Sequence, residues 1–510
     1  MIAVWIPACA GMTMRVFLFE FMIKQRDDME IQTSEKTTFD TQDEFNRKPI
    51  AENIIRLLTS DIDLSPMVID GGWGTGKTEF CKKLIRLMQE QHRDYQPVYI
   101  DAFRSDHSGE PLLALLAEII KACTPEDTGE QPSEQRKNIT RKVARAVGFA
   151  MKTVAKAAVG HVLKQKWEDL EEGMSQITND GQEAKNAAAT VAGVATTLAS
   201  HSIDATIDAT VEALLKEQIE AEKNLETLKA CLKELAAGKP IILFIDELDR
   251  CRPDYAVDML EVIKHVFDIE NVKVVLVTNT KQLCAAINHR YGAEVDAQKY
   301  LDKFLKYSFA LPDQVVAQTE QDRVLVSIHH FKRLIKGSDI EGVLFNAHRV
   351  MDCISEMIKR NNLSLRETER LVRFLEMYHS LGHGFGFRNK TFHLYLRVVG
   401  VFIFCFYPRL MDDINKNRTD AGEFAQLFNL QSWPDMLDDP YDPKGIVDMI
   451  AVMLILNSKI EDPRFTLLEF NEKHYWQTLI DRYFGSEAIN WGLSVLKNTF
   501  QVLSFEQTPQ

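Results

Sequence analysis

Short apolar runs rich in β-branched residues alternate along the chain with segments of helical periodicity. The runs lie at Met67–Asp70, 98–103, 241–245, Val272–Thr278 and 307–312. Runs of this length, bounded by turn residues, predict buried strands. Between them, apolar residues recur three and four positions apart at 45–58, 80–88, 111–122, 253–267 and 299–306. Because strands that alternate with helices form parallel sheets, the pattern predicts an α/β fold.

The second half of the chain has helical periodicity almost throughout. Residues 316–381 predict several helices, one of which begins at Ser364. A glycine-containing break at 382–389 predicts a boundary, and the segments 392–410 and 446–456 beyond it are strongly apolar. The apolar stretch between Arg397 and Pro408 is well short of the roughly 20 residues that span a membrane. We therefore expect buried helices of a C-terminal helical domain.

A glycine-rich segment follows the first predicted strand and has the pattern G-x-x-x-x-G-K-[ST]. It consists of Gly71, Gly72, Trp73, Gly74, Thr75, Gly76, Lys77 and Thr78. This pattern between a strand and a helix predicts a phosphate-binding P-loop. Glycines let several backbone N–H groups point at one anion, and the helix N-terminus adds its positive dipole end. We expect Lys77 to neutralise the β- and γ-phosphates and the Thr78 hydroxyl to bind Mg²⁺. A chance match in a glycine-rich turn is the weaker alternative.

The apolar run at 241–245 ends in two carboxylates, which predicts a Walker B strand. Asp246 is expected to hold the Mg²⁺ shell, and Glu247 to orient and deprotonate the attacking water. The alternative is a buried strand with a polar end. Asn279 follows the next strand and is the first candidate for contact with the γ-phosphate or the water, and Thr278 is the second. Both motifs in this order predict an ATPase-type core that binds a nucleotide with Mg²⁺.

Arginines near these motifs are candidates for stabilising the transition state of phosphoryl transfer. Arg250 and Arg252 closely follow the Walker B carboxylates, and Arg366 and Arg370 lie four apart on a predicted lid helix. A neighbouring subunit often supplies such an arginine. The chain is therefore a candidate homo-oligomer. Solvent-exposed side chains remain an equal alternative for the two lid arginines.

The stretch between the two Walker motifs is far longer than one crossover needs, which predicts an insertion at 124–238. Residues 141–166 form a basic amphipathic pattern that suits a membrane surface, a partner groove or, as we favour, packing within the insertion. Residues 187–200 are too short and too weakly apolar to span a bilayer. Leucines spaced three and four apart within 211–235 predict a coiled-coil-like seam.

Composition limits the remaining possibilities. The chain has 510 residues, a net charge of -14 and eight scattered cysteines without a C-x-x-C pair. The acidic balance gives no strong nucleic-acid signal, and the cysteines suggest a reduced, cytoplasmic protein. The expected domains are an N-terminal tail at 1–44 with several alternative start methionines, the P-loop core at 45–123 and 239–315, the insertion at 124–238, a helical lid at 316–382 and a C-terminal helical domain at 383–510.

Four signatures in the same order resemble the KAP family of P-loop NTPases. The P-loop with Trp73 is similar to G-x-W-G-x-G-K-[ST], and residues 245–251 resemble I-D-D-L-D-R-C, with Glu247 in place of the commoner Asp. Residues 300–304 with 311–312 resemble Y-L-E-K…L-P, and 45–54 resemble the region before the family's P-loop. The resemblance covers 45–381 without the insertion. It implies an ASCE-type core in which the sensor strand lies between the P-loop and Walker B strands.

Two functional interpretations follow. The first is an ATP-binding and ATP-hydrolysing switch, for which the family resemblance implies ATP rather than GTP and a role in phage defence or signalling. The second is a nucleotide-binding scaffold whose insertion or C-terminal domain binds a protein partner, with incidental hydrolysis. A small-nucleotide kinase is disfavoured because its compact architecture has no place for these parts. Many relatives carry membrane helices in the insertion, whereas this chain lacks a clean span. We expect a cytoplasmic protein with at most peripheral contact with the inner membrane face.

Overall fold

The computed structural model describes residues 37–123, 225–316, 323–346, 349–381, 391–436, 443–459, 462–465, 470–485 and 488–505. The chain forms two compact units. The α/β unit contains residues 49–70 and 78–309, and the helical unit contains residues 40–48, 71–77 and 310–510. The expectations for the basic segment 141–166, for 187–200 and for the break at 382–389 lie outside the described residues.

The α/β unit is built on a sheet with the strand order β2-β3-β4-β1-β5. The strands are β1 (Met67–Asp70), β2 (Gln96–Asp101), β3 (Ile241–Asp246), β4 (Val272–Thr278) and β5 (Tyr307–Ala310). The pairs β2–β3, β3–β4 and β1–β4 are parallel, so their carboxyl ends meet at one edge. The predicted α/β fold is confirmed, and the sensor strand β4 lies between the P-loop strand β1 and the Walker B strand β3.

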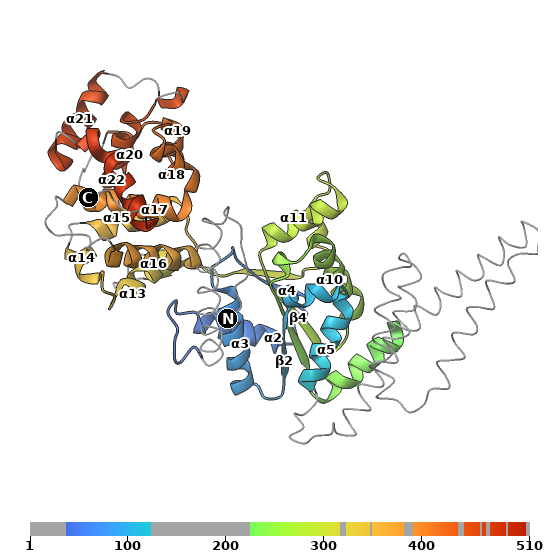
Figure 1. Ribbon diagram of the computed structural model, residues 1–510. Coiled ribbons are helices and arrows are strands. Elements are labelled where there is room, and N and C mark those ends of the chain that lie inside the picture. The colour runs from blue at the N-terminus through green and yellow to red at the C-terminus, as the bar shows by residue number, and fades with distance from the viewer. Residues whose placement is uncertain are drawn as a thin grey trace, which may run out of the picture. The chain divides into compact units, whose positions relative to one another are not determined.

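Helices cover both faces of the sheet. Alternate residues of the strands, such as Val68, Leu243 and Val274, share one core with α5 (Pro111–Cys123), a helix at 225–238, α10 (Pro253–Val266) and α11 (Thr280–Tyr291). Figure 1 shows α2 (Lys48–Leu58) and α3 (Lys77–Gln91) on the other side of the strands from α5 and α10. Burial on both faces explains why the strand sequences are apolar throughout rather than alternating.

The leucines that predicted a coiled-coil-like seam belong to this core instead. Leu228 and Leu232 are fully buried, and Leu225 and Leu235 pack against the same cluster. An amphipathic helix that packs on a sheet has the same spacing of three and four as a short coiled-coil seam. The coiled-coil interpretation was therefore wrong for this helix.

The helical unit has one hydrophobic core that extends from Ile328 to Leu503. It contains α13 (Val326–Ile335), α14 (Glu341–Asn346), α15 (Val350–Arg360), α16 (Leu365–Leu381), α17 (Thr391–Phe406), α18 (Pro408–Asn415), α19 (Ala421–Leu427), α20 (Pro443–Leu456), α21 (Phe470–Phe484) and α22 (Ala488–Leu503). α15 packs against α20, and α16 against α17. Helices from either side of the predicted boundary at 382 thus share one interior.

Three predicted elements differ from the structure. The strand expected at 98–103 ends at Asp101, whose side chain caps a short helix over Ala102–Ser105. The helix expected at 299–306 is α12 (Ala297–Leu301), because the Asp296 side chain caps its start. The apolar helix expected at 392–410 is divided between α17 and α18, and Pro408 occupies the first turn of α18.

The region expected to be helical from 316 onward also holds a small antiparallel sheet. β6 (Gln314–Val316) pairs with β7 (Arg323–Leu325) immediately before α13. Strands of three residues are too short to show the period-two alternation that identifies strands in a sequence. The helical prediction was therefore wrong for these residues.

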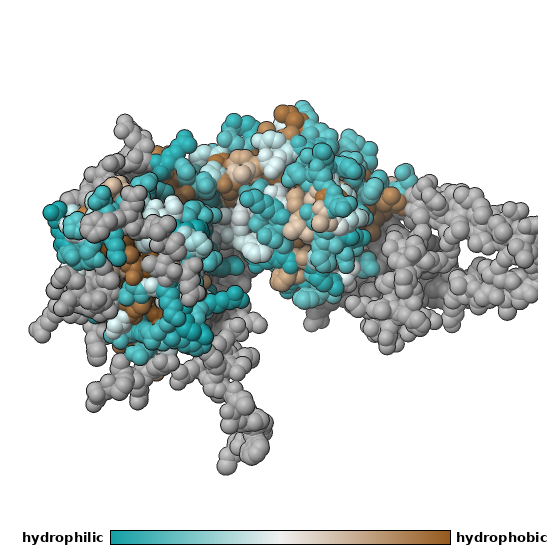
Figure 2. Space-filling view, turned by 90° about the horizontal axis from the view of Figure 1, so that it is seen from above, coloured by the Kyte–Doolittle hydropathy of each residue, from teal (hydrophilic) through white to brown (hydrophobic). Residues whose placement is uncertain are grey.

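The surface of the described residues is largely hydrophilic on the face that Figure 2 shows, where hydrophobic residues form separate spots. Trp73 and Val316 are among the exposed large apolar side chains. Among the described helices, none combines the length and the apolar character that crossing a bilayer requires.

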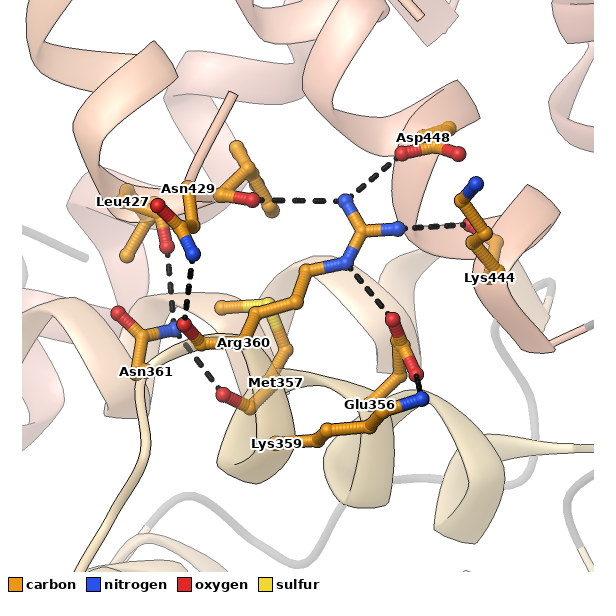
Figure 3. Close-up of polar contacts among 10 residues, drawn as sticks. Glu356, Met357, Lys359, Arg360, Asn361, Leu427, Asn429, Lys444 and Asp448 are labelled. Atoms are coloured by element: carbon orange, nitrogen blue, oxygen red, sulfur yellow. Dashed lines mark hydrogen bonds and ion pairs between the residues drawn. The ribbon is translucent and has the colours of Figure 1, made fainter. Parts of the chain in front are cut away.

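A buried arginine ties the lid helices to the C-terminal helices (Figure 3). Arg360, the last residue of α15, donates to Glu356 at 2.9 Å and to Asp448 of α20 at 2.7 Å. Two further N–H groups reach the carbonyls of Phe428 and Lys444, both at 3.4 Å. Asp448 is only 1% exposed. Removing one partner of such a pair leaves an uncompensated buried charge.

We expect Arg360→Met to lower the free energy of unfolding by roughly 3–5 kcal/mol, because Asp448 loses its counter-charge. Urea denaturation measures the change. Arg418→Met removes an exposed arginine that pairs with Asp413 on α18, and this control should cost at most about 1 kcal/mol. Equal effects of the two substitutions would show that the Arg360 pair is not critical to the packing.

Candidate functional site

The loop at 71–76, which continues directly from β1, has a backbone that requires glycine at several positions. Gly74 and Gly76 have φ values of +71° and +82°, in the left-handed region that glycine adopts without strain. A Cβ atom on Gly71 would lie 2.9 Å from the Thr75 hydroxyl. That hydroxyl donates to the Gly72 carbonyl at 2.8 Å, which closes the loop on itself. The result is a tight cradle in which side chains at these glycines would clash.

Lys77, the first residue of α3, lies over this loop. Its ammonium donates to the carbonyls of Gly71 at 2.6 Å and Gly72 at 2.9 Å, and the residue is 9% exposed. The positive charge is thus held beside the loop, where it adds to the dipole at the N-terminus of α3. Thr78 is half-buried in the first turn of α3, and Trp73 is 53% exposed.

The N-terminus of α16 contacts the loop within the helical unit. The Leu365 N–H donates to the Gly74 carbonyl at 2.9 Å. Just before it, Ser364 and Glu367 form a capping box, with the Glu367 carboxylate 2.8 Å from the Ser364 N–H. The capped turn therefore presents a backbone donor to the P-loop.

The two lid arginines occupy different places. Arg366 is exposed and lies beside the P-loop, because a Cβ atom on Gly74 would be 3.4 Å from the Cβ of Arg366. Arg370 instead lies over the rings of Phe374 and Phe406, 5.8 and 5.9 Å from their centroids. Arg366 is thus the lid arginine that the structure places next to the loop.

Asp246 ends β3 and is only 1% exposed. Its carboxylate accepts from the Glu247 N–H at 2.8 Å and from the Tyr99 hydroxyl at 3.1 Å. Burial, and then the charge of Asp246, raises the pKa of the Tyr99 phenol, which therefore remains a donor. Sequence reasoning missed Tyr99, because only the pairing of β2 with β3 places this tyrosine beside the Walker B carboxylate.

Glu247 has an unusual backbone and a charged partner. Its φ and ψ of 60° and 24° are left-handed, a conformation that costs energy for a non-glycine residue and that clusters at functional sites. Arg250 lies 2.8 Å from its carboxylate. The hydroxyl of Thr278 on β4 donates to Asp249 at 3.1 Å, which ties the sensor strand to the turn after β3.

Two further candidates have local partners. The Asn279 side chain caps α11 by accepting from the Lys281 N–H at 3.2 Å. Arg252 donates through its side chain and its backbone N–H to the two oxygens of Asp106, at 2.9 and 3.1 Å. Their roles in catalysis stay predictions.

The residues present fit Mg²⁺ in the manner of phosphoryl-transfer sites. Among the described residues, no group of three or more His, Cys, Asp or Glu side chains gathers around a possible metal position. Mg²⁺ at such sites needs only one or two carboxylates, because waters and substrate phosphates complete the octahedron. The buried Asp246 carboxylate and the Thr78 hydroxyl supply oxygen ligands of that kind.

The segment 40–48 also reaches the loop within the helical unit. Arg47, which is 5% exposed, donates to the Thr75 carbonyl at 3.1 Å and to the Pro312 carbonyl at 3.3 Å. Its guanidinium lies 4.8 Å from the centroid of the Phe45 ring. In the sequence, Arg47 was part of an amphipathic pattern without a specific role, because nothing in the pattern shows its contact with the loop.

His330 of α13 anchors the same segment to the lid. It contacts Glu44 at 2.7 Å and Glu369 of α16 at 3.2 Å, and Arg333 also binds Glu44. Burial disfavours the charged imidazole, but the hydrogen bonds and charges of Glu369 and Glu44 raise the pKa of His330 to about 9. Burial likewise opposes the charge of Glu44, yet His330 and Arg333 lower its pKa. The histidine is therefore charged at neutral pH and bridges two carboxylates.

A glycine cradle after β1, a lysine above it and a buried carboxylate at the end of β3, with β4 between those strands, are together characteristic of the P-loop NTPases, which bind nucleotides. The chain belongs to the KAP family, because the KAP family P-loop domain matches residues 47–381.

Two further comparisons describe what the chain is similar to. The phage T7 exclusion protein of Escherichia coli (strain K12) is 23% identical over 274 residues, which are 53% of this chain but only 33% of that protein. The Aeropyrum pernix ORC2 protein, solved as ADPNP–ADP complexes, aligns with 89% of this chain and 94% of its own at 12% identity. Its TM-score of 0.32 is too low to support any argument about this chain.

The pH dependence of stability tests the His330 cluster. The pKa of His330 in the folded protein, about 9, lies above the ordinary value of 6.5. The charged imidazole therefore contributes fully to the free energy of unfolding below pH 6.5, and this contribution is lost as the pH rises through about 9. We expect the free energy of unfolding to fall by on the order of 3 kcal/mol over this interval relative to His330→Gln. Urea denaturation at stepped pH gives both curves, and parallel curves would contradict a bridging, charged histidine.

Proposed function

We propose that this KAP-family protein binds ATP with Mg²⁺, hydrolyses it and uses the cycle as a conformational switch. The observation that carries the proposal is the position of Glu247 directly after the buried Asp246 at the carboxyl end of β3. A P-loop protein needs only the loop and the lysine to bind a nucleotide. The second carboxylate is the group that hydrolysis requires, because it can accept a proton from the attacking water.

Each residue of the site has a separate role in this proposal. The N–H groups of the loop and the Lys77 ammonium bind the β- and γ-phosphates, while Thr78 and Asp246 hold the Mg²⁺, which neutralises the developing charge. Glu247 orients the water and takes its proton. Asn279 senses the γ-phosphate, and Thr278 supports the same edge of the sheet through Asp249.

The ion pair between Glu247 and Arg250 supports a regulated rather than a constitutive ATPase. A carboxylate that is held 2.8 Å from a guanidinium is not free to orient the attacking water. Turnover then requires Arg250 to leave Glu247, for example to contact the phosphates of a neighbouring subunit. We propose a homo-oligomer on this basis, in which Arg250 and the loop-adjacent Arg366 are the candidate arginines for the transition state.

The second candidate function is a nucleotide-binding scaffold with incidental hydrolysis. The same ion pair favours it, because a permanently paired Glu247 would leave the nucleotide bound. In either case we propose that residues 124–238 or the C-terminal helices bind a protein partner. The match to a phage exclusion protein covers a third of that protein. This similarity supports a role in phage defence, and signalling is the alternative role.

Lys77→Ala tests nucleotide binding. Removing the ammonium that faces the phosphates should weaken the binding of ATP by roughly 1.5–3 kcal/mol, the value of a hydrogen bond to a charged group. Isothermal titration calorimetry with ATP and GTP measures the loss and the base preference. Lys299→Ala, which changes an exposed lysine beside Asp296, is the matched control and should bind like the wild type. Undiminished ATP binding by Lys77→Ala would rule out the P-loop assignment.

Glu247→Gln tests hydrolysis separately from binding. The amide keeps the shape of the side chain but cannot accept a proton, so phosphate release should fall by roughly 10²–10⁴ while ATP binding persists. A coupled phosphate-release assay measures the rate. Glu270→Gln removes the same charge from an exposed residue paired with Lys233 and should leave the rate unchanged. Full turnover by Glu247→Gln would contradict the assignment of Glu247 as the general base, whereas a wild type that binds ATP without releasing phosphate would support the scaffold.

A further inference from the structure

Two successive peptide groups of the P-loop are held by donors from outside the loop. The Leu365 N–H binds the Gly74 carbonyl at 2.9 Å, and the Arg47 guanidinium binds the Thr75 carbonyl at 3.1 Å. Both donors belong to the helical unit, as does the loop. The loop therefore does not depend on its own sequence alone for its conformation.

A trans peptide group is planar, and its C=O and N–H bonds point in opposite directions. The Gly74 carbonyl shares its peptide group with the Thr75 N–H, and the Thr75 carbonyl shares its group with the Gly76 N–H. A donor that fixes each carbonyl thus also fixes the direction of the next N–H group. The two carbonyl oxygens then point away from an anion bound in the loop. The two N–H groups of the same peptide groups point in the opposite direction, toward that anion.

The Arg47 contact is specific in its geometry. The guanidinium is almost fully buried, reaches Thr75 and Pro312 with different nitrogens and stacks near Phe45. A Cβ atom on Gly76 would lie only 3.2 Å from the same nitrogen that binds Thr75. Glycine at 76 therefore provides the room for the arginine as well as the left-handed backbone. A lysine cannot reproduce this planar, forked set of donors.

The segment that carries Arg47 is fastened at its other end to the lid. The Asp43 carboxylate accepts from the N–H groups of Arg47 and Lys48, both at 2.8 Å, which fixes the turn before α2. Glu44 is bound by His330, which also contacts Glu369 of α16. The segment that carries Arg47 is thus fastened to α13 and to α16, and the first turn of α16 also supplies the Leu365 donor.

We propose that Arg47 is a positioning residue that orients the Thr75–Gly76 peptide group so that its N–H faces the bound phosphate. The segment 40–48 and the start of α16 form one brace around the loop. Phosphate affinity and the seating of the lid are consequently coupled through this brace. The proposal rests on the proposed function in one respect, namely that the loop binds nucleotide phosphates.

The test compares Arg47→Ala, Arg47→Lys and the control Arg56→Ala, which changes an exposed arginine on α2, the helix that follows Arg47. Calorimetric titration with ADP should show about tenfold weaker binding for Arg47→Ala, the loss of one charge-assisted hydrogen bond at the loop. Arg47→Lys should recover part of the affinity, and Arg56→Ala should match the wild type. Glu44→Gln, which retains Arg47 but loosens its segment, should weaken binding by a smaller factor.

Hydrogen exchange without nucleotide supplies a readout that global destabilisation would not reproduce. Amide exchange in the peptide that covers 71–77 should accelerate in Arg47→Ala and Glu44→Gln, while exchange in β3 and β4 stays at the wild-type rate. If Arg47→Ala does not fold, the ADP affinity and the amide exchange of Arg47→Lys and Glu44→Gln are compared with those of the wild type instead.

The outcomes separate the two proposals. A wild-type protein that does not bind ADP or ATP would overturn the proposed function. A wild type that binds ADP, together with equal affinity and equal exchange at 71–77 in the Arg47 variants and Glu44→Gln, would overturn the positioning role and leave the proposed function intact. Faster exchange throughout the protein would also overturn it, because Arg47 would then act on general stability.

Discussion

The parallel pairing of β1, β4 and β3 is the constraint on which the candidate site depends. Parallel strands bring their carboxyl ends to one edge, so segments far apart in the sequence leave the sheet side by side. β1 leads into the glycine loop, β3 into Asp246 and Glu247, and β4 into Asn279. Burial of both faces of the sheet fixes the register, because a slip of one residue would exchange the core side chains of each strand.

A second layer of interactions sets the detailed geometry of the charged groups. The Asp246 carboxylate is oriented by Tyr99 from the neighbouring strand, and Glu247 is engaged by Arg250. Arg47 and the capped start of α16 hold the loop within the helical unit. The motif residues provide the chemistry of the site, whereas their orientation is determined by residues outside the motifs.

The sequence predicted the strands, their α/β class and the Walker motifs because these features are local and periodic. Three apolar residues before Asp70 and five before Asp246 suffice to indicate buried strands. The contacts of Tyr99 and Arg47 could not be predicted, since they depend on strand order and on packing between segments far apart in the chain. The leucines at 225–235 show a related limit: their spacing indicated an apolar helix face but not that the partner is a sheet. Three-residue strands and the cap at Asp296 fall below the length over which periodicity can be read.

The shared interior of the helical unit has a mechanical consequence. α16 supplies a donor to the loop at its first turn and packs against α17, while the Arg360–Asp448 pair ties α15 to α20. Well-packed cores do not deform gradually but move as blocks. A displacement of the first turn of α16 would therefore also move the C-terminal helices that share its core. The turn that contacts the P-loop and the C-terminal helices are thus parts of one packed block.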